Sequence, residues 1–324
     1  MTPRAASVPL AIAGALLGCR AEPIPEWQRF PAGTPLVPHY VTVDGTRIRY
    51  VEAGQGPTVV LIHGLAASLY SWRYTIVPLA QAGFRVIAFD NRGFGFSDKP
   101  AQGYANATYA GVLFGLLDSL GVTDAVLVGH SMGGAIAAEA ALMQPDRARG
   151  LVLVDAAGLG VRWPFILRVA RWPIVGALFN GLRGRNATAR ILKALYADPS
   201  RITNQDVDQY YAPLAEPGFG RSLRGVLREF RFDGLQGRLG QIQTPTLVMW
   251  GAQDRLIPAT VGHAMVSGLG HAALERFAGV GHALPEEAPG AFNRALLTFL
   301  QSGLPAPPEN VARLPSLAPL DMQH

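Results

Sequence analysis

Short, nearly continuous runs of apolar residues alternate along the chain with longer stretches of helical periodicity. The runs cover residues 58–62, 85–89, 125–128, 151–154, 246–250 and 273–277. Runs that are apolar at nearly every position are typical of parallel strands covered on both faces. Helical patterns fall between them, over residues 69–82, 107–120, 131–143, 258–268 and 285–300. This alternation predicts an α/β fold with a doubly wound, mostly parallel sheet.

Two departures from the alternation divide the chain. Residues 37–43 and 47–53 alternate apolar and polar positions around Asp44-Gly45, which predicts a hairpin ahead of the sheet. Between Val154 and Thr246 about ninety residues pass without a good strand pattern, which is too long for one crossover and predicts an inserted helical cap. The predicted order is a core over 37–158 and 241–303, a cap over 159–240, and a proline-rich tail over 304–324.

The first residues have the pattern of an export signal. The apolar run over residues 8–18 is about as long as the hydrophobic region of a signal peptide and short for a membrane span. It ends at Gly18-Cys19, which resembles the bacterial lipobox, whose cysteine is lipidated and becomes the mature N-terminus. We expect a signal peptide or anchor over 1–19, a tether over 20–36, and an exported lipoprotein held at the membrane through Cys19. An uncleaved membrane anchor, plain secretion and a cytoplasmic location are the alternatives.

Composition excludes several classes of protein. The chain has 324 residues, of which 49% are hydrophobic and 16% charged, so it can bury a sizeable core and is not a disordered or coiled-coil protein. Its single cysteine cannot form an internal disulfide and excludes cysteine-rich zinc modules and iron–sulfur clusters. The sequence also lacks H-E-x-x-H, G-x-G-x-x-G and Walker A patterns, so we expect no metal and no cofactor.

A nucleophile pattern follows one of the predicted strands directly. Gly129-His130-Ser131-Met132-Gly133 matches G-x-S-x-G between a strand and a helix. In so tight a turn, side chains at Gly129 or Gly133 would collide with neighbouring chain. The start of the following helix also favours negative charge that develops near Ser131. We interpret Ser131 as a catalytic nucleophile rather than an ordinary serine in a glycine-rich turn.

A serine nucleophile requires a histidine base, and the chain has seven histidines. His282 is the predicted base, because its glycine-flanked loop follows the last strand, where sheets of this kind place their sites. His130 adjoins the nucleophile and is expected to point away from it. Four further histidines lie in segments that suit a peripheral, solvated or packing role, at positions 39, 263, 271 and 324, and His63 follows the strand over 58–62.

A carboxylate must orient the base, and three aspartates lie at or shortly after the ends of predicted strands. We favour Asp254, in Trp250-Gly-Ala-Gln-Asp254 after the penultimate strand, as the acceptor of the imidazole Nδ1–H. Asp155 is the competing acid. Asp90 is followed by Asn-Arg-Gly, which indicates a carboxylate that stabilises a turn.

These motifs together resemble the α/β-hydrolase superfamily, over about residues 41–300. His63-Gly64 resembles the family's oxyanion loop, residues 90–97 resemble its D-x-R-G-x-G-x-S turn, and residues 129–133 resemble its nucleophile elbow. The resemblance implies an α/β-hydrolase fold. It also implies that the backbone N–H groups of Leu65 and Met132 form the oxyanion hole.

The residue at the elbow distinguishes branches of that superfamily. Epoxide hydrolases and haloalkane dehalogenases carry Asp there, and Ser131 argues against both. The resemblance therefore implies a serine hydrolase, an esterase or lipase-like enzyme that cleaves carboxylic esters through an acyl-enzyme. One alternative is a meta-cleavage C–C hydrolase, although that group usually reads H-G-x-G-P-G at the oxyanion loop. The others are a cofactor-free perhydrolase and, from another class, a non-catalytic binding protein of the same fold.

The positive charge of the chain is concentrated in the predicted cap. Residues 159–205 carry eight Lys or Arg residues and one Asp, or +7, so the rest of the chain carries −2 of the net +5. Tryptophans interleave with the first of these arginines, a pattern that fits a membrane surface or a lipid-facing lid. We expect the cap to bind a small-molecule or lipid ester, with no nucleic-acid partner. The alternative is a cap whose apolar face covers the site while its arginines face water.

Overall fold

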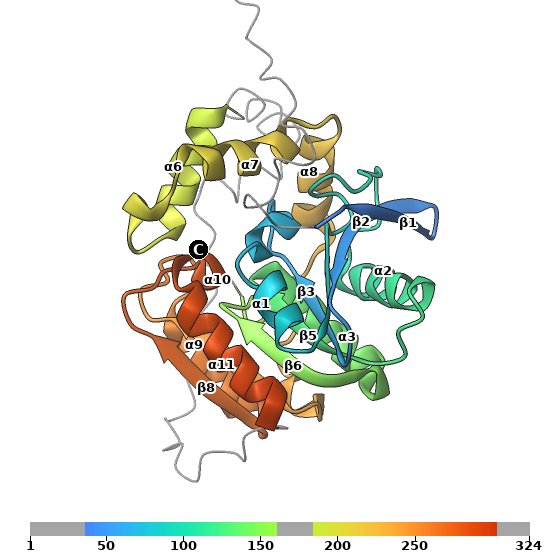
Figure 1. The fold of residues 1–324 in the computed structure, drawn as a ribbon, viewed down its shortest axis with the longest axis vertical. Coiled ribbons are helices and arrows are strands. Elements are labelled where there is room, and N and C mark those ends of the chain that lie inside the picture. The colour runs from blue at the N-terminus through green and yellow to red at the C-terminus, as the bar shows by residue number, and fades with distance from the viewer. Residues whose placement is uncertain (1–35, 161–183, 303–324) are drawn as a thin grey trace, which may run out of the picture.

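The computed structural model describes residues 36–160 and 184–302. Its centre is an eight-stranded sheet in the order β1-β2-β4-β3-β5-β6-β7-β8 (Figure 1). β2 is antiparallel to both of its neighbours, β1 and β4. The strands β3 to β8 are all parallel to one another. The strands are β1 His39–Val43, β2 Thr46–Ala53, β3 Thr58–Ile62, β4 Arg85–Phe89, β5 Ala125–His130, β6 Ala148–Val154, β7 Thr246–Gly251 and β8 Ala272–Phe277. The predicted mostly parallel α/β sheet is confirmed.

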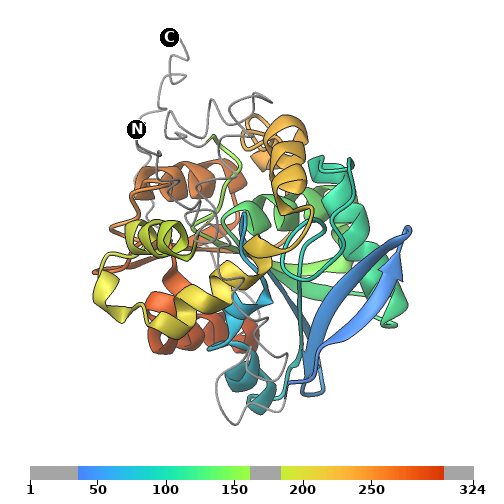
Figure 2. The same cartoon turned by 90° about the horizontal axis from the view of Figure 1, so that it is seen from above.

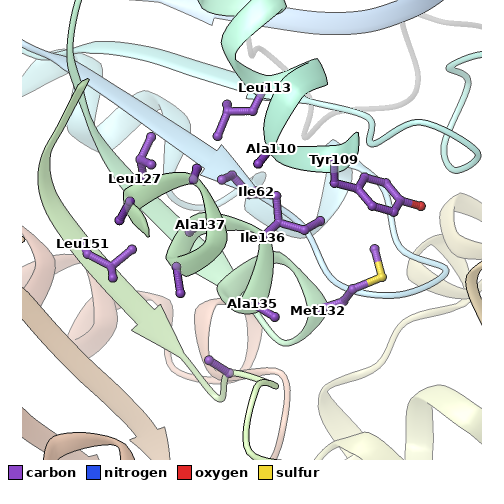
Figure 3. Packing of buried hydrophobic residues seen from close by; sticks show 14 of the residues in the cluster. Ile62, Tyr109, Ala110, Leu113, Leu127, Met132, Ala135, Ile136, Ala137 and Leu151 are labelled. Carbon is purple, nitrogen blue, oxygen red and sulfur yellow. The ribbon is translucent and has the colours of Figure 1, made fainter. Parts of the chain in front are cut away.

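Helices cover both faces of the sheet, which explains why the strands are apolar at consecutive positions. Val60 and Ile62 of β3 enter the core cluster on one face, whereas Val59 and Leu61 enter the cluster on the other. The first cluster includes side chains of α2, α3 and α9, and Figure 3 shows its packing between β3, β5 and α3. The second includes side chains of α1, α10 and α11. These helices are α1 Ile76–Gln81, α2 Asn106–Ser119, α3 Met132–Met143, α9 Ala259–Leu269, α10 Leu284–Glu287 and α11 Pro289–Ser302.

Two of the predicted helices are interrupted. The pattern over residues 69–82 forms a short 3₁₀ helix, Leu69–Trp72, and then α1, which begins only at Ile76. Pro78 explains this start, because it has no N–H to donate and is accommodated only in the first turn of a helix. The pattern over 285–300 likewise divides at Ala288 into α10 and α11, and Pro289 opens the second helix.

Helices also fill the interval between β6 and β7. They are α6 Arg185–Leu195, α7 Asn204–Ala215 and α8 Phe219–Glu229, with 3₁₀ helices at Pro199–Arg201 and Leu239–Gln241. α7 packs against both α6 and α8, and Figures 1 and 2 show the three helices together on one side of the core. A capping box between Thr203 and Asp206 fixes the start of α7. The described part of this interval contains no strand.

Several expectations concern residues outside the described ranges. They are the leader, Cys19 and the tether, the arginines and tryptophans of 161–183, and the tail over 304–324. Among the residues that are described, no helix has both the length and the apolar character needed to cross a membrane.

Candidate active site

Ser131 lies on a sharp turn between β5 and α3. Its backbone has φ 55° and ψ −119°, a conformation that costs a residue with a side chain about 1–3 kcal/mol. Neighbouring chain holds it there on both sides. The Ser131 N–H donates to the Val154 carbonyl at 2.9 Å, and the Ser131 carbonyl accepts from the N–H groups of Gly134 and Ala157 at 3.0 Å.

The glycines of the elbow are required by close backbone contacts. A Cβ atom on Gly129 would lie 2.2 Å from the Gly133 carbonyl oxygen, and one on Gly133 would lie 2.1 Å from the Ile62 carbonyl oxygen. Both obstacles are backbone atoms, which cannot move aside as a flexible side chain can. The sequence motif therefore reflects how tightly β5, the elbow and β3 approach each other.

The structure brings Asp254 and His282 into direct contact. Asp254 follows β7 and His282 follows β8, and their Oδ2 and Nδ1 atoms are 2.7 Å apart. The other carboxylate oxygen, Oδ1, accepts the N–H groups of Leu256 at 2.7 Å and Ile257 at 2.9 Å. Since the carboxylate orients the ring with Nδ1–H toward it, Nε2 of His282 is the nitrogen left to accept a proton.

His130 connects the elbow to the loop of the base. Its Nε2–H donates to the carbonyl of His282 at 2.7 Å, and the two ring centroids are 4.9 Å apart. Burial, together with the nearby charge of His282, lowers the pKa of His130 to about 3, so this imidazole is neutral at physiological pH. The sequence predicts that His130 adjoins the nucleophile and points away from it, but predicts no contact with the loop of the base. Its position beside Ser131 is the one signal that could have indicated this contact.

The loop after β3 lies directly against the elbow. A Cβ atom on Gly64 would be 3.0 Å from the Cβ of Ser131, so only a glycine fits here without displacement. The next residue in this loop is Leu65. Neither its N–H nor that of Met132 has a hydrogen-bond acceptor among the described residues. Two free donors beside the nucleophile are the feature that an oxyanion hole requires.

His63 and Asn91 hold this loop in place. The His63 ring donates from Nδ1 to the Gly64 carbonyl at 2.7 Å and accepts the Asn91 N–H on Nε2 at 2.9 Å. The Asn91 side chain donates in turn to the His63 carbonyl at 2.9 Å. Burial lowers the pKa of His63, which keeps the ring in the neutral form that these two bonds need. The sequence pattern indicates Asn91 only as part of the turn after Asp90.

Asp155 and Asp90 occupy other positions. Asp155 Oδ1 accepts the Gly251 N–H at 2.8 Å, and burial, followed by the charge of Asp254, raises the pKa of the Asp155 carboxyl well above its usual value. Asp155 therefore lies behind the acid loop, whereas Asp254 is the residue that contacts the imidazole. Asp90 accepts the N–H groups of Leu69 and Phe96 at 2.7 and 2.8 Å, as a carboxylate that stabilises a turn does.

The surroundings of the elbow combine core and cap. Phe94, from the turn after β4, makes edge contacts with the ring of His63 at 6.4 Å and with Phe219 of α8 at 6.2 Å. Met132 and Phe219 belong to one buried hydrophobic cluster, and the partly buried Leu65 packs against it. In the described ranges, no group of three or more His, Cys, Asp or Glu residues could hold a metal ion.

The chain is similar to known proteins over most of its length. Residues 57–190 match the family model of the alpha/beta hydrolase fold. A 2-hydroxy-6-oxononadienedioate/2-hydroxy-6-oxononatrienedioate hydrolase of Pseudomonas putida is 35% identical over 268 residues, 78% of this chain and 91% of the relative. A 2-hydroxy-6-oxo-6-phenylhexa-2,4-dienoate hydrolase of Comamonas testosteroni is 32% identical over 280 residues, with the same coverage of 78% and 91%.

A solved structure extends the similarity to three dimensions. A bacterial membrane phospholipase A superposes with a TM-score of 0.71 at 28% identity, covering 83% of this chain and 86% of the other. The strand order, the strained elbow and these relatives agree. The chain therefore belongs to the α/β-hydrolase family.

Proposed function

We propose that the protein is a serine hydrolase that cleaves a bond beside a carbonyl group through an acyl-enzyme. The observation that carries this proposal is the 2.7 Å contact between Asp254 and His282, whose carbonyl is bonded to His130 of the elbow. It supplies an oriented base for Ser131, which among the serines of the described ranges is the one with a positive φ. In this proposal the three residues form a catalytic triad.

The first half of the reaction follows from these positions. His282 Nε2 removes the proton of Ser131 as its oxygen attacks the substrate carbonyl. Negative charge then develops on the carbonyl oxygen, where the free N–H groups of Leu65 and Met132 stabilise it. Loss of one such donor typically raises the barrier by about 2.7–4 kcal/mol. The imidazolium of His282, stabilised by Asp254, gives its proton to the leaving group, and Ser131 is acylated.

The second half repeats the same roles with water. His282 takes a proton from a water molecule as the water attacks the acyl-enzyme, and then returns it to Ser131 as the acid product leaves. His130 and Asp155 transfer no proton in this scheme. His130 supports the carbonyl of His282, and Asp155 supports the strand end before the acid loop.

We propose a C–C bond beside a ketone as the first substrate class. The relatives named above are hydrolases of oxo-dienoates, and both cover more than nine-tenths of their own length in the comparison. In such a substrate the ketone is the electrophile and the leaving group is a carbon stabilised by the conjugated system. Ser131 becomes acylated in the same way, while the leaving carbon receives the proton.

A carboxylic ester is the second candidate, favoured by the oxyanion loop. The C–C hydrolases usually read H-G-x-G-P-G here, whereas this chain reads His63-Gly64-Leu65-Ala66-Ala67. Ala66 takes the place of the second glycine of that motif and adopts φ 57°, a left-handed conformation that glycine accepts more easily, so the difference lies in the residues of the loop and not in its backbone conformation at this position. The similar phospholipase A structure supports the ester as well.

One comparison of substrates tests the proposal and separates the two classes. Purified protein is assayed with 2-hydroxy-6-oxo-6-phenylhexa-2,4-dienoate and with a chain-length series of p-nitrophenyl acyl esters, with Ser131→Ala as the control. A kcat/KM at least a hundredfold higher for the dienoate supports C–C hydrolysis, and the reverse ratio supports an esterase. Turnover that survives in Ser131→Ala contradicts the serine mechanism for either class.

The proposed membrane association depends on the leader and is tested separately. Cys19 remains our proposed site of lipid attachment in an exported protein. Expression of the full chain and of Cys19→Ala in a bacterial host, followed by intact-mass analysis and fractionation, checks it. We expect a diacylglyceryl adduct and a membrane location that are both lost in the variant. Equal fractionation of the two proteins contradicts attachment through Cys19.

A further inference from the structure

Glu287 ends the short helix α10, five residues after the base His282. Its side chain is almost fully buried, with 1% of the residue exposed. Among the described residues its carboxylate pairs with no cation and accepts backbone N–H groups instead. A carboxylate buried in this way needs its hydrogen bonds, because burial removes the water that would otherwise solvate it.

The N–H groups bound by Glu287 come from two distant segments. Ala197 donates to both carboxylate oxygens, at 2.9 and 3.1 Å, and Asp198 donates to Oε1 at 3.1 Å. These two residues follow the last turn of α6 in the cap (Figure 1). Gly281, the residue directly before the base, donates to Oε2 at 2.9 Å. One carboxylate therefore connects the end of α6 to the loop of His282.

A second contact joins the same two segments without any side chain. The His282 N–H donates to the carbonyl of Leu195 at 2.8 Å. The segments also approach too closely for a side chain at Gly281, where a Cβ atom would lie 2.4 Å from the Leu195 carbonyl oxygen. The N–H of the base is thus bonded to the cap, whereas its carbonyl accepts from His130 and its imidazole is oriented by Asp254, both of the core.

We propose that Glu287 is a positioning residue for His282, and that it holds the base in place only while the end of α6 is docked against it. The inference rests on the proposed function, because it assumes that His282 is the base. Opening of the cap at this end breaks the bonds of Glu287 to Ala197 and Asp198 and the bond of His282 to Leu195. The nucleophile elbow has its own support from β3 and β6 and is unaffected.

The chain offers a matched control at the next position. Glu286 is also buried and also connects α10 to the cap, through Tyr210 at 2.5 Å and through Arg73, which binds Asp206 of α7 at 2.8 Å. Among the described residues its carboxylate makes no hydrogen bond to the loop of the base, to which only the Glu286 backbone N–H donates, at the Ala283 carbonyl. In Glu286→Gln the amide oxygen can accept from Arg73 while the amide nitrogen donates to the Tyr210 hydroxyl. In Glu287→Gln the amide nitrogen must face an N–H donor in either orientation.

The two substitutions are compared by steady-state turnover of a p-nitrophenyl ester and by the rate of Ser131 labelling with a fluorophosphonate. For Glu287→Gln we expect kcat and the labelling rate to fall together by about 10–100-fold with KM within threefold, since a small displacement of a catalytic group costs about that much. For Glu286→Gln both rates should stay within threefold of the wild type. If Glu287→Gln does not fold, Glu287→Asp and Glu286→Asp carry the same comparison, because aspartate keeps the acceptor oxygens but shortens their reach.

Three results overturn the inference. The first is a Glu287→Gln protein that loses thermal stability but keeps both rates, which indicates a purely structural role. The second is a rise in KM with kcat unchanged, which indicates substrate binding by the cap alone. The third is equal loss of rate at positions 286 and 287. Ser131→Ala separates these failures from failure of the proposed function: if it retains turnover, the serine mechanism is wrong and the inference falls with it.

Discussion

Asp254→Asn tests the orientation of the base by changing one atom. In the native site Oδ1 of Asp254 accepts two N–H groups, from Leu256 and Ile257, and Oδ2 lies 2.7 Å from Nδ1 of His282. An amide nitrogen cannot accept, so the amide oxygen of the variant keeps the position beside the two N–H groups. The amide N–H₂ then faces His282 Nδ1 in place of the carboxylate oxygen.

The consequence is the wrong tautomer of the base. His282 must accept at Nδ1, so its proton moves to Nε2, where it can no longer receive the proton of Ser131. The same exchange in serine proteases lowers kcat about 10⁴-fold, which corresponds to about 5 kcal/mol of transition-state stabilisation. We therefore expect kcat of Asp254→Asn to fall by about four orders of magnitude, with a much smaller change in KM.

The measurement is kcat and KM on the better of the two proposed substrates, together with the fluorophosphonate labelling rate and the thermal midpoint. Asp155→Asn is the matched control, because Asp155 is an equally buried strand-end aspartate that binds Gly251 and does not contact His282. We expect its kcat to stay within about threefold of the wild type, since its removal leaves the tautomer of the base unchanged. A loss of less than tenfold in Asp254→Asn, or an equal loss in Asp155→Asn, refutes this reasoning.

The remaining predictions concern stability. The pKa of Asp155 is raised above its usual value near 3.8, so its buried carboxyl is most stable with its proton bound. As the pH rises from about 4, the free energy of unfolding of the wild type should therefore fall relative to that of Asp155→Asn, measured by urea unfolding at a series of pH values. A difference between the two proteins that does not change with pH contradicts this prediction. The pKa of His130 is lowered from 6.5 to about 3, so the free energy of unfolding should fall as the pH is lowered from 6.5 toward 3, by up to about 1.4 kcal/mol per pH unit. His130→Gln should reduce this dependence of stability on pH. Ser131→Gly should raise the free energy of unfolding by about 1 kcal/mol while abolishing turnover, because glycine accepts φ 55° without strain. An unchanged midpoint of unfolding would show that the elbow stores no backbone strain. Gly133→Ala should leave little folded protein on size exclusion, because its Cβ atom would lie 2.1 Å from a backbone oxygen, and a stable variant would contradict the packing of the elbow.

The parts of the molecule that the sequence predicted well are those governed by local pattern. Strands buried on both faces are apolar at every position, as Val59 to Ile62 are, so their runs are visible without knowledge of their neighbours. The elbow is also local, since Gly129 and Gly133 contact backbone within a few residues or on the adjacent strand β3, and Ser131 is bonded to Gly134 and to the adjacent strand β6. The sequence accordingly predicted the sheet and a position for each of the proposed catalytic residues.

The parts it missed depend on contacts between distant segments. Glu287 reads as one of two acidic residues in a short helix, and only the fold brings it to Ala197, 90 residues away. His130 had no visible partner, because the carbonyl that it binds lies 152 residues along the chain. Pro78 indicates that a helix begins close to residue 76, but the apolar periodicity continues on both sides of this point and led to the prediction of one continuous helix.

Mapping of a covalent adduct tests the central claim most directly. The wild type is treated with a fluorophosphonate, digested and analysed by mass spectrometry, in parallel with Ser131→Ala and with untreated protein. We predict a single adduct on the peptide that contains Ser131, formed with saturating kinetics and absent from Ser131→Ala. An unlabelled wild type under conditions that label a known serine hydrolase, or an adduct that persists in Ser131→Ala, contradicts the assignment of Ser131 as the nucleophile.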